Sequence, residues 1–236
     1  MPLNRFHPTI VLRRLLLAAL VAGCAGPAPK PPVAPPVQLA TTASAAPFTR
    51  LIADRAVTGV APVEITRVSS NEDLLDSAAQ PGVVGLTLFF PQGTPLWATP
   101  LGNEPLAIVV HPSRDTAGLT LEAVRQIFSG QTAGWQVTVR EAGDDSRAAF
   151  EALTETRPAP AARVMPSPEA MLNFVSQTPD AIGYLPWRWV TEAVKALPVD
   201  GKAPTASDYP LMAMAVAVAR QEPTGAVRDW LAQAQK

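Results

Sequence analysis

Apolar and polar residues follow two different periods in the first part of the chain, and their succession predicts strands and helices in turn. Residues 48–55 carry apolar side chains at helical spacing, whereas residues 63–67 alternate as a half-buried strand does. Residues 82–90 form a continuous apolar run, which is typical of a strand buried in a parallel sheet. With an apolar start at Val37 and a helix over 72–80, the order predicts a parallel sheet covered by helices.

The same two patterns continue to the end of the chain. A residue that can accept the first free N–H groups of a helix stands before four of the expected helices: Asn71, Thr120, Ser167 and Thr224. The helices are expected at 72–80, 121–129, 147–155, 168–177 and 225–235, and further strands at 104–112, 134–143, 162–167, 180–187, 194–201 and 209–219. This repeated alternation of strands and helices indicates an α/β fold.

The first 23 residues have the pattern of a secretory signal peptide. Arg5, Arg13 and Arg14 make the beginning positive, no acidic residue occurs before Cys24, and an apolar stretch, LLLAALVAG, follows. A membrane-spanning helix needs roughly 20 apolar residues, so this stretch is too short to be one. The ending LVAGC resembles a bacterial lipobox, which predicts cleavage before Cys24 and lipidation of its sulfur. The alternative is an ordinary signal peptide with an incidental cysteine.

Composition changes after the cysteine. Residues 24–36 include GPAPKPPVAPP, a Pro-rich tether that would extend by roughly 3.1 Å per residue and hold a domain away from a membrane. The folded domain is expected at residues 37–236. Removing the three arginines of the signal peptide changes the formal net charge from −1 to −4. A weakly acidic chain does not favour nucleic acid as a partner, because nucleic-acid binding requires a basic face.

The sequence offers little support for catalysis. Beyond the signal peptide it has one histidine, His111, and Cys24 is its one cysteine. It contains no His/Cys metal cluster and no Gly-rich phosphate loop, and no Ser–His–Asp set is suggested. We therefore expect no catalytic residue, metal ligand or cofactor, and we assign His111 a structural role. An enzyme on this fold is the least favoured hypothesis.

The longest distinctive segment is AIVVHPSRDTAGLTLEAVRQIFSGQTAGW at 107–135, in which a strand end is followed by GLT, IFSG and Trp. This pattern resembles the phosphate-binding-protein-like branch of bacterial solute-binding proteins, which serve ABC importers. PDAIGYLP at 179–186, VDGKAPTASDYPL at 199–211 and the opening segment VQLATTASAAPFTRLIADRA resemble other family segments. The likeness spans residues 37–236 and is weakest at 85–103.

The resemblance implies a two-lobed, type 2 periplasmic-binding-protein-like α/β fold with two crossing strands and an interlobe cleft. Lobe 1 would comprise residues 37–106 and 196–236, and lobe 2 residues 107–195. Closure of the lobes around a ligand would be a hinge motion. The segment at 91–105 is shorter than the family's usual passage to the crossing strand.

Three helix starts are candidates for binding an oxyanion, because helix N-termini supply N–H groups and a positive dipole end. The candidate residues are Thr41, Thr42 and Ser44 at the first start, Ser69, Ser70 and Asn71 at the second, and Arg140, Gly143, Asp144, Asp145 and Ser146 at the third. The threonines and Ser44 could instead form only a turn and a helix cap. Arg140 could instead form a surface ion pair, although it ends a strand where open α/β sheets bind ligands.

The third start departs from the family pattern Arg-x-x-Gly-Ser-Gly-Thr. Arg140 and Gly143 match it and Ser146 is a fair substitute for Thr, but Asp144 replaces Ser and Asp145 replaces Gly. Unit charges 4 Å apart interact by about 4 kcal/mol at an effective dielectric constant of 20, so two carboxylates facing a phosphate would oppose its binding. The family's phosphate binders also end the third strand with an Asp, and GLTLFFPQG contains no acid.

Three interpretations of Asp144 and Asp145 arise from the residues. They could cap the helix that begins there, they could pair with Arg140 or Arg147 and leave a closed or vestigial site, or they could recognise a cationic or hydroxylated ligand. If they point into the cleft, phosphate is the wrong ligand. If they point away as caps, their N–H groups remain available to an anion.

Two functional hypotheses result. The leading hypothesis is an extracytoplasmic lipoprotein, acting as a monomer, that binds phosphate or a related oxyanion and delivers it to an ABC permease in the membrane. The second is a non-transport interaction or sensory module of the cell envelope, on the same fold, with an altered or lost anion site. Asp144, Asp145 and the shortened chain motivate the second hypothesis.

Overall fold

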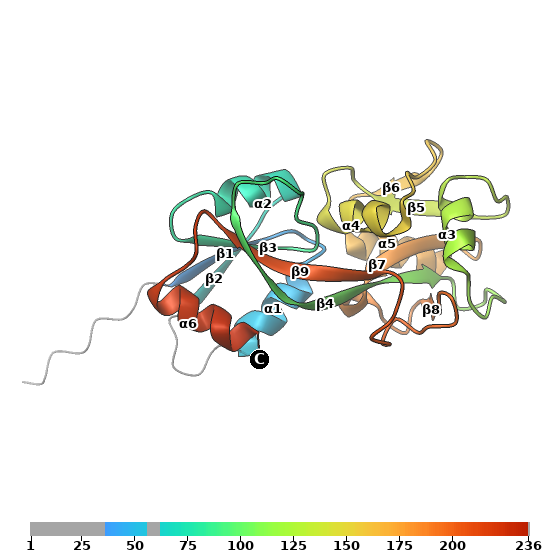
Figure 1. Ribbon diagram of the computed structural model, residues 1–236. Helices are drawn as coiled ribbons and strands as arrows, with labels where there is room; N and C mark the ends of the chain where they lie inside the picture. Colours follow the sequence, from blue (N-terminus) through green and yellow to red (C-terminus); the bar gives the residue numbers. More distant parts are fainter. Residues whose placement is uncertain (1–35, 56–61, 236) are drawn as a thin grey trace, which may run out of the picture. The chain divides into compact units, whose positions relative to one another are not determined.

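The computed structural model describes residues 36–55 and 62–235 of the chain (Figure 1). The predicted signal peptide, Cys24 and residues 24–35 of the predicted tether lie outside these residues, so those predictions stay untested. Within the described ranges, no helix has the length and apolar character required to cross a membrane.

The described residues contain nine strands and six α-helices, which alternate except that β3 is followed by β4 and no α-helix separates β7, β8 and β9. The strands are β1 (Val37–Thr41), β2 (Val63–Arg67), β3 (Val83–Thr87), β4 (Trp97–Val110), β5 (Gln136–Arg140), β6 (Arg163–Met165), β7 (Ala181–Pro186), β8 (Lys195–Leu197) and β9 (Met212–Ala219). The helices are α1 (Ala46–Arg55), α2 (Asn71–Ala78), α3 (Leu121–Phe128), α4 (Asp145–Thr154), α5 (Pro168–Gln177) and α6 (Gly225–Ala234), with a 3-10 turn, η1, at Trp187–Trp189.

One long strand connects two groups of strands. The strand order is β2-β1-β3-β9-β4-β7-β5-β6, with β8 also pairing with β4. Residues 97–105 of β4 pair with β9, and residues 106–110 pair with β7 and β8. Figure 1 shows β4 and β9 side by side between the two groups. We call the group around β1, β2 and β3 lobe 1 and the group around β5, β6 and β7 lobe 2, and this arrangement agrees with the expected two-lobed α/β fold.

A continuous core spans both groups of strands. Its largest buried members include Ile52 on α1, Leu106 and Ile108 on β4, and Phe150 on α4. Burying one such side chain contributes about 1.5–3 kcal/mol to folding. Hydrogen bonds from Thr42 and Ser44, just before α1, to Asp145 and Asp144 place the N-terminal ends of α1 and α4 near each other.

Most expected elements are confirmed, with three local corrections. Thr120 and Ser167 cap α3 and α5 as predicted, since their hydroxyls accept the N–H groups of Ala123 and Ala170. Strand β4 begins at Trp97 rather than at residue 104, because the segment before Glu104 pairs with β9.

The other two corrections concern helix caps. Ser70, not Asn71, caps α2: the Ser70 hydroxyl accepts the N–H of Asp73, and Asn71 is the first residue of the helix. Thr224 stands at the N-cap of α6, but its side chain makes no capping hydrogen bond. The lobe limits given by residue number stay a prediction.

Candidate functional site

Strand β5 and helix α4 place Arg140 and the two aspartates at one point. Arg140 is the last residue of β5, a turn comes next, and α4 begins at Asp145. Helix α4 is held by Phe150, whose ring stacks on Tyr184 with centroids 4.2 Å apart. The Tyr184 hydroxyl accepts the backbone N–H of Arg140 at 3.2 Å. Burial raises the pKa of Tyr184, so this hydroxyl stays protonated.

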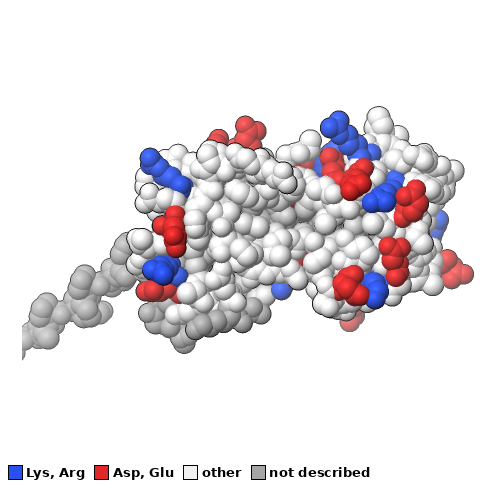
Figure 2. Space-filling model, in the orientation of Figure 1, with Lys and Arg blue, Asp and Glu red and all other residues white. Residues whose placement is uncertain are grey.

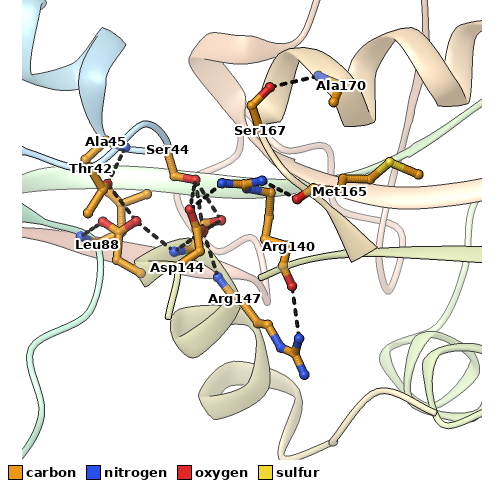
Figure 3. Close-up of polar contacts among 12 residues, drawn as sticks. Thr42, Ser44, Ala45, Leu88, Arg140, Asp144, Arg147, Met165, Ser167 and Ala170 are labelled. Atoms are coloured by element: carbon orange, nitrogen blue, oxygen red, sulfur yellow. Dashed lines mark hydrogen bonds and ion pairs between the residues drawn. The ribbon is translucent and has the colours of Figure 1, made fainter. Parts of the chain in front are cut away.

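The carboxylate of Asp144 is surrounded by donors of the kind that bind oxyanions (Figure 3). The Arg140 guanidinium approaches it to 2.9 Å, and both side chains are 4% exposed. The Ser44 hydroxyl donates to both of its oxygens at 2.8 and 2.9 Å, and the Ser146 hydroxyl also donates to it. The backbone N–H groups of Ser146 and Arg147, at the start of α4, donate at 3.0 and 3.3 Å. Asp144 is therefore an N-cap that is also held by a buried arginine and by two hydroxyls.

Asp145 fills a second, adjoining set of donors. Its carboxylate accepts the Thr42 hydroxyl and the backbone N–H of Leu88, each at 2.8 Å, and it lies 3.4 Å from the Thr87 hydroxyl. The side chain is fully buried. Burial, and then the negative charge of Asp144, raises the pKa of Asp145 to about 7. With one guanidinium for two carboxylates, a proton on Asp145 removes the uncompensated charge.

The donors in lobe 1 come from the loop between β1 and α1. The Thr42 hydroxyl accepts the N–H of Ala45 while donating to Asp145, which fixes the loop as a helix start. The Ser44 carbonyl accepts the indole N–H of Trp189, in η1, at 3.1 Å. The loop therefore contacts lobe 2 through the hydroxyls of Thr42 and Ser44 and through the carbonyl of Ser44.

Asn71 and Gly143 add a backbone contact between the lobes. The N–H of Asn71 donates to the carbonyl of Gly143 at 2.8 Å, and a Cβ on Gly143 would lie 3.1 Å from the Cβ of Ser70. Glycine at this position thus permits the close approach. The Asn71 side chain points elsewhere: it donates to the Phe89 carbonyl and accepts the Thr87 hydroxyl.

The structure brings most, but not all, of the predicted site residues together. Thr42, Ser44, Arg140, Asp144, Asp145 and Ser146 form one hydrogen-bonded group, which we call the Asp144 cluster. Thr41 lies outside it, because its hydroxyl pairs with that of Thr49 at 2.7 Å. Ser70 serves α2, and Ser69 is exposed. Whether any of these residues binds a ligand stays a prediction.

Sequence reasoning missed the contribution of the third strand. Leu88 offers a backbone N–H to Asp145, and a backbone donor at the end of an apolar run leaves no mark in the sequence. It also missed the Met165 carbonyl, which accepts one Arg140 nitrogen. Arg140 Nε is buried and has no hydrogen-bond partner among the described residues.

Asp144 shows both the capping and the ion pairing that the sequence suggested, and whether the site is closed or vestigial stays a prediction. Asp144 caps α4 and also pairs with Arg140, whereas the Arg147 guanidinium pairs with Glu151 at 2.7 Å. The interpretation of Arg140 as a surface ion-pair residue is wrong, because Arg140 is 3% exposed. The aspartates point into the contact between the lobes rather than away from it, and Asp144 holds the donors that an oxyanion would need.

Charge elsewhere is mixed. On the face shown in Figure 2, acidic and basic side chains are interspersed and do not gather into a large patch of one sign. Within the described residues, no group of three or more His, Cys, Asp or Glu side chains is arranged to hold a metal ion.

Comparisons with known proteins agree with this fold. A family model described as a PBP superfamily domain matches residues 26–233. The chain is 27% identical over 143 residues to the phosphate-binding protein PstS of Bacillus subtilis (strain 168). This match covers 53% of this chain and 48% of that protein. The chain thus matches about half the length of this curated relative.

Solved structures share the fold at low identity. A putative phosphate ABC transporter substrate-binding protein from Clostridium perfringens, with bound phosphate, has a TM-score of 0.75 at 18% identity, over 84% of this chain and 92% of that one. An ABC-type phosphate transport receptor from Vibrio cholerae has a TM-score of 0.68 at 19% identity, over 85% and 93%. The reduced OxyR regulatory domain from Pseudomonas aeruginosa has a TM-score of 0.62 at 14% identity, over 85% and 96%. The family match over nearly all of the described residues carries the assignment: this chain belongs to the PBP superfamily.

Proposed function

We propose that this protein is an exported, lipid-anchored member of the PBP superfamily that acts as an interaction or sensory module of the cell envelope, without capturing free phosphate. The observation that carries this proposal is the position of Asp144. Its carboxylate accepts hydrogen bonds from Arg140, Ser44, Ser146 and the start of α4, and so takes the place of a bound oxyanion.

Physical magnitudes favour the internal carboxylate over a free ion. The Asp144 carboxylate accepts the N–H of Ser146, only two residues further along the same chain. It therefore occupies these donors without the loss of translational freedom that a free ion incurs on binding. A phosphate entering beside Asp144 would meet a like charge, and about 4 kcal/mol at 4 Å corresponds to roughly a thousandfold loss of affinity. The lobes are thus held together by contacts that need no ligand.

Such a module does not require a new fold. The OxyR regulatory domain has the same fold at low identity, and a fold by itself does not determine a function. In this proposal the folded domain stays tethered to the membrane through Cys24, in the periplasm or at the outer face of the membrane. It presents the joined form of its two lobes to a partner.

The test is a calorimetric titration of the full-length protein in detergent with phosphate, sulfate, molybdate and tungstate. The wild type is expected to give no heat at millimolar ligand. Asp144→Ser removes the internal carboxylate and restores a hydroxyl, so it is expected to gain phosphate binding. Adding Arg140→Ala to that variant should abolish the gain. Asp115→Ser, which changes an exposed aspartate, is the matched control and should behave as the wild type does.

A second candidate function is delivery of an oxyanion to an ABC permease. It is favoured by the donor set, because a buried guanidinium, two hydroxyls and a helix N-terminus suit phosphate, and by the likeness to the Bacillus subtilis protein. Submillimolar phosphate binding to the wild type, lost in Arg140→Ala, would support this candidate and overturn the first.

The membrane anchor has its own test. Cys24→Ser is expected to move the protein from the membrane fraction to the soluble fraction of fractionated cells, because the predicted lipid is attached to that sulfur. A wild type that is already soluble after export would favour the ordinary signal peptide.

A further inference from the structure

A pocket lies at the carboxyl ends of β1 and β2, and none of the residues of the Asp144 cluster lines it. It has a volume of about 360 Å³, within the range of small-molecule sites. Open α/β sheets bind ligands at the carboxyl ends of their strands. Its wall includes Thr41, Pro47, Arg50, Ile65, Arg67 and Trp189.

Two arginines give this pocket its charge. Arg50 lies on α1, Arg67 is the last residue of β2, and both are exposed. Neither guanidinium forms an ion pair with an acidic side chain of residues 36–55 and 62–235. Glu64 is near in sequence, but alternation along β2 places it on the opposite face from Arg67, where it accepts a hydrogen bond from Gln38 at 2.7 Å. The pocket therefore presents positive charge that these acids do not neutralise.

Apart from Thr41, the remaining wall is apolar. Ile65 is 42% exposed, one of three large hydrophobic side chains that the described residues leave exposed. Trp189 reaches the pocket from lobe 2, and the hydrogen bond from its indole to the Ser44 carbonyl fixes the ring. An inorganic ion would use the arginines and leave this wall uncovered. A ligand with an acidic group and an apolar body would use both.

We propose that this pocket, the Arg50–Arg67 pocket, binds a small organic anion in which a carboxylate or phosphate is attached to an apolar, ring-sized body. The acidic group contacts Arg50 and Arg67, and the body lies against Ile65 and Trp189. The proposal goes beyond the function proposed above and does not depend on it, because neither arginine takes part in the Asp144 cluster. The Arg50–Arg67 pocket would give a sensory module a ligand site that is distinct from the Asp144 cluster.

The experiment titrates the full-length protein in detergent with phenyl phosphate and benzoate, and with inorganic phosphate and phenol as the two separate halves of the first probe. Binding is followed by calorimetry and by tryptophan fluorescence. At least one of the two organic anions is expected to bind saturably and about tenfold more tightly than either half, which corresponds to about 1.4 kcal/mol. Trp189→Phe should remove the fluorescence change.

The decisive variant is the double substitution Arg50→Gln with Arg67→Gln, compared with Arg157→Gln, which changes an exposed arginine of lobe 2. The double variant is expected to lose at least about tenfold in affinity, and the control to lose none. Circular dichroism and the urea midpoint verify that each variant is folded.

Failure of this proposal is distinguishable from failure of the proposed function. If neither organic anion binds the wild type, or if binding survives in the double variant, the pocket is not the site. If inorganic phosphate binds as tightly as phenyl phosphate and Arg140→Ala abolishes both, the Asp144 cluster is the site and both proposals are overturned. Binding that is lost only in the double variant supports the pocket. The proposed function is then decided separately, by the titration of the wild type and Asp144→Ser with inorganic anions.

Discussion

Arg140 and Arg67 occupy equivalent positions in the fold and have opposite surroundings. Each is the last residue of a strand that runs parallel to its neighbour, β5 for Arg140 and β2 for Arg67. Arg140 is 3% exposed and pairs with Asp144, whereas Arg67 is exposed and lines an open pocket. The two strand ends therefore differ in whether the arginine already has a carboxylate partner among the described residues.

The turn after each strand produces this difference. After β5 the turn brings Asp144 back to the arginine, because an N-cap residue directs its side chain toward the free N–H groups of its helix. After β2 the cap is Ser70, which is neutral and uses its hydroxyl for the N–H of Asp73. An acidic cap thus supplies Arg140 with a carboxylate partner, whereas the neutral cap after β2 supplies none to Arg67.

The largest expected effect is on stability. Arg140→Ala should lower the free energy of unfolding by about 3–5 kcal/mol, because it leaves the Asp144 carboxylate buried without a counter-ion. Arg67→Ala should change it by no more than about 0.5 kcal/mol, as substitutions of exposed residues usually do. Urea unfolding of both variants measures the difference. The double variant Arg140→Ala with Asp144→Ala should lose less than Arg140→Ala alone, and equal losses in all of these variants would refute the comparison.

The next effect is a dependence on pH at the buried site. The folded protein keeps the Asp145 proton up to about pH 7, whereas an unfolded chain releases it near pH 3.8. Raising the pH through this window therefore lowers the free energy of unfolding, by up to about 1.4 kcal/mol per pH unit for one proton. The side chain in Asp145→Asn cannot titrate, so the free energy of unfolding of this variant should depend less on pH. Relative to the wild type, the variant should become more stable as the pH rises from 5 to 7.5.

Urea unfolding across that range is the measurement, with Asp115→Asn as an exposed control that should match the wild type. Parallel curves for the wild type and Asp145→Asn would mean that Asp145 is ionised throughout. The protein would then hold two buried negative charges against one guanidinium.

A smaller effect concerns the approach of the turn after β5 to α2. Gly143→Ala would place a methyl group 3.1 Å from the Cβ of Ser70, and crowding of this kind costs about 1 kcal/mol. Ala142→Ser, at an exposed neighbour, should stay within about 0.5 kcal/mol of the wild type. The two unfolding midpoints test whether close contact between the lobes stabilises the Asp144 cluster, and identical midpoints would argue that the turn yields freely.

The smallest effect is a difference in how the interactions of the two arginines respond to ionic strength. Exposed charges are screened over about 10 Å at 0.1 M ionic strength, and buried pairs are screened much less. Phenyl phosphate binding at the Arg50–Arg67 pocket should therefore weaken several-fold between low and high sodium chloride. The stability difference between the wild type and Arg140→Ala should stay nearly constant in the same series. A salt-independent affinity would point to a buried site instead.

Local patterns in the sequence predict most elements correctly. Thr120 and Ser167 identify their helices because a cap acts within one turn of the chain. The beginning of β4 has no such local signal, since most of residues 97–103 are exposed or half-exposed and become a strand only by pairing with β9. The prediction of Asn71 as the cap is wrong. Ser and Asn are equally good caps, so local preference does not choose between Ser70 and Asn71, and contacts with other segments decide where the helix begins.

The sequence by itself determined that Arg140 stands near the end of a strand, that Asp144 and Asp145 stand before or at the start of the next helix, and that hydroxyl residues stand before the first helix. These features depend on local propensity and spacing. The tertiary structure decided what the acids do. Ser44 and Thr42, which donate to Asp144 and Asp145, lie 100 and 103 positions away along the chain. The pKa of Asp145 depends on its burial and on the nearby charge of Asp144, and Arg140 is paired with Asp144 in the same buried region. This burial arises only when these distant segments pack together.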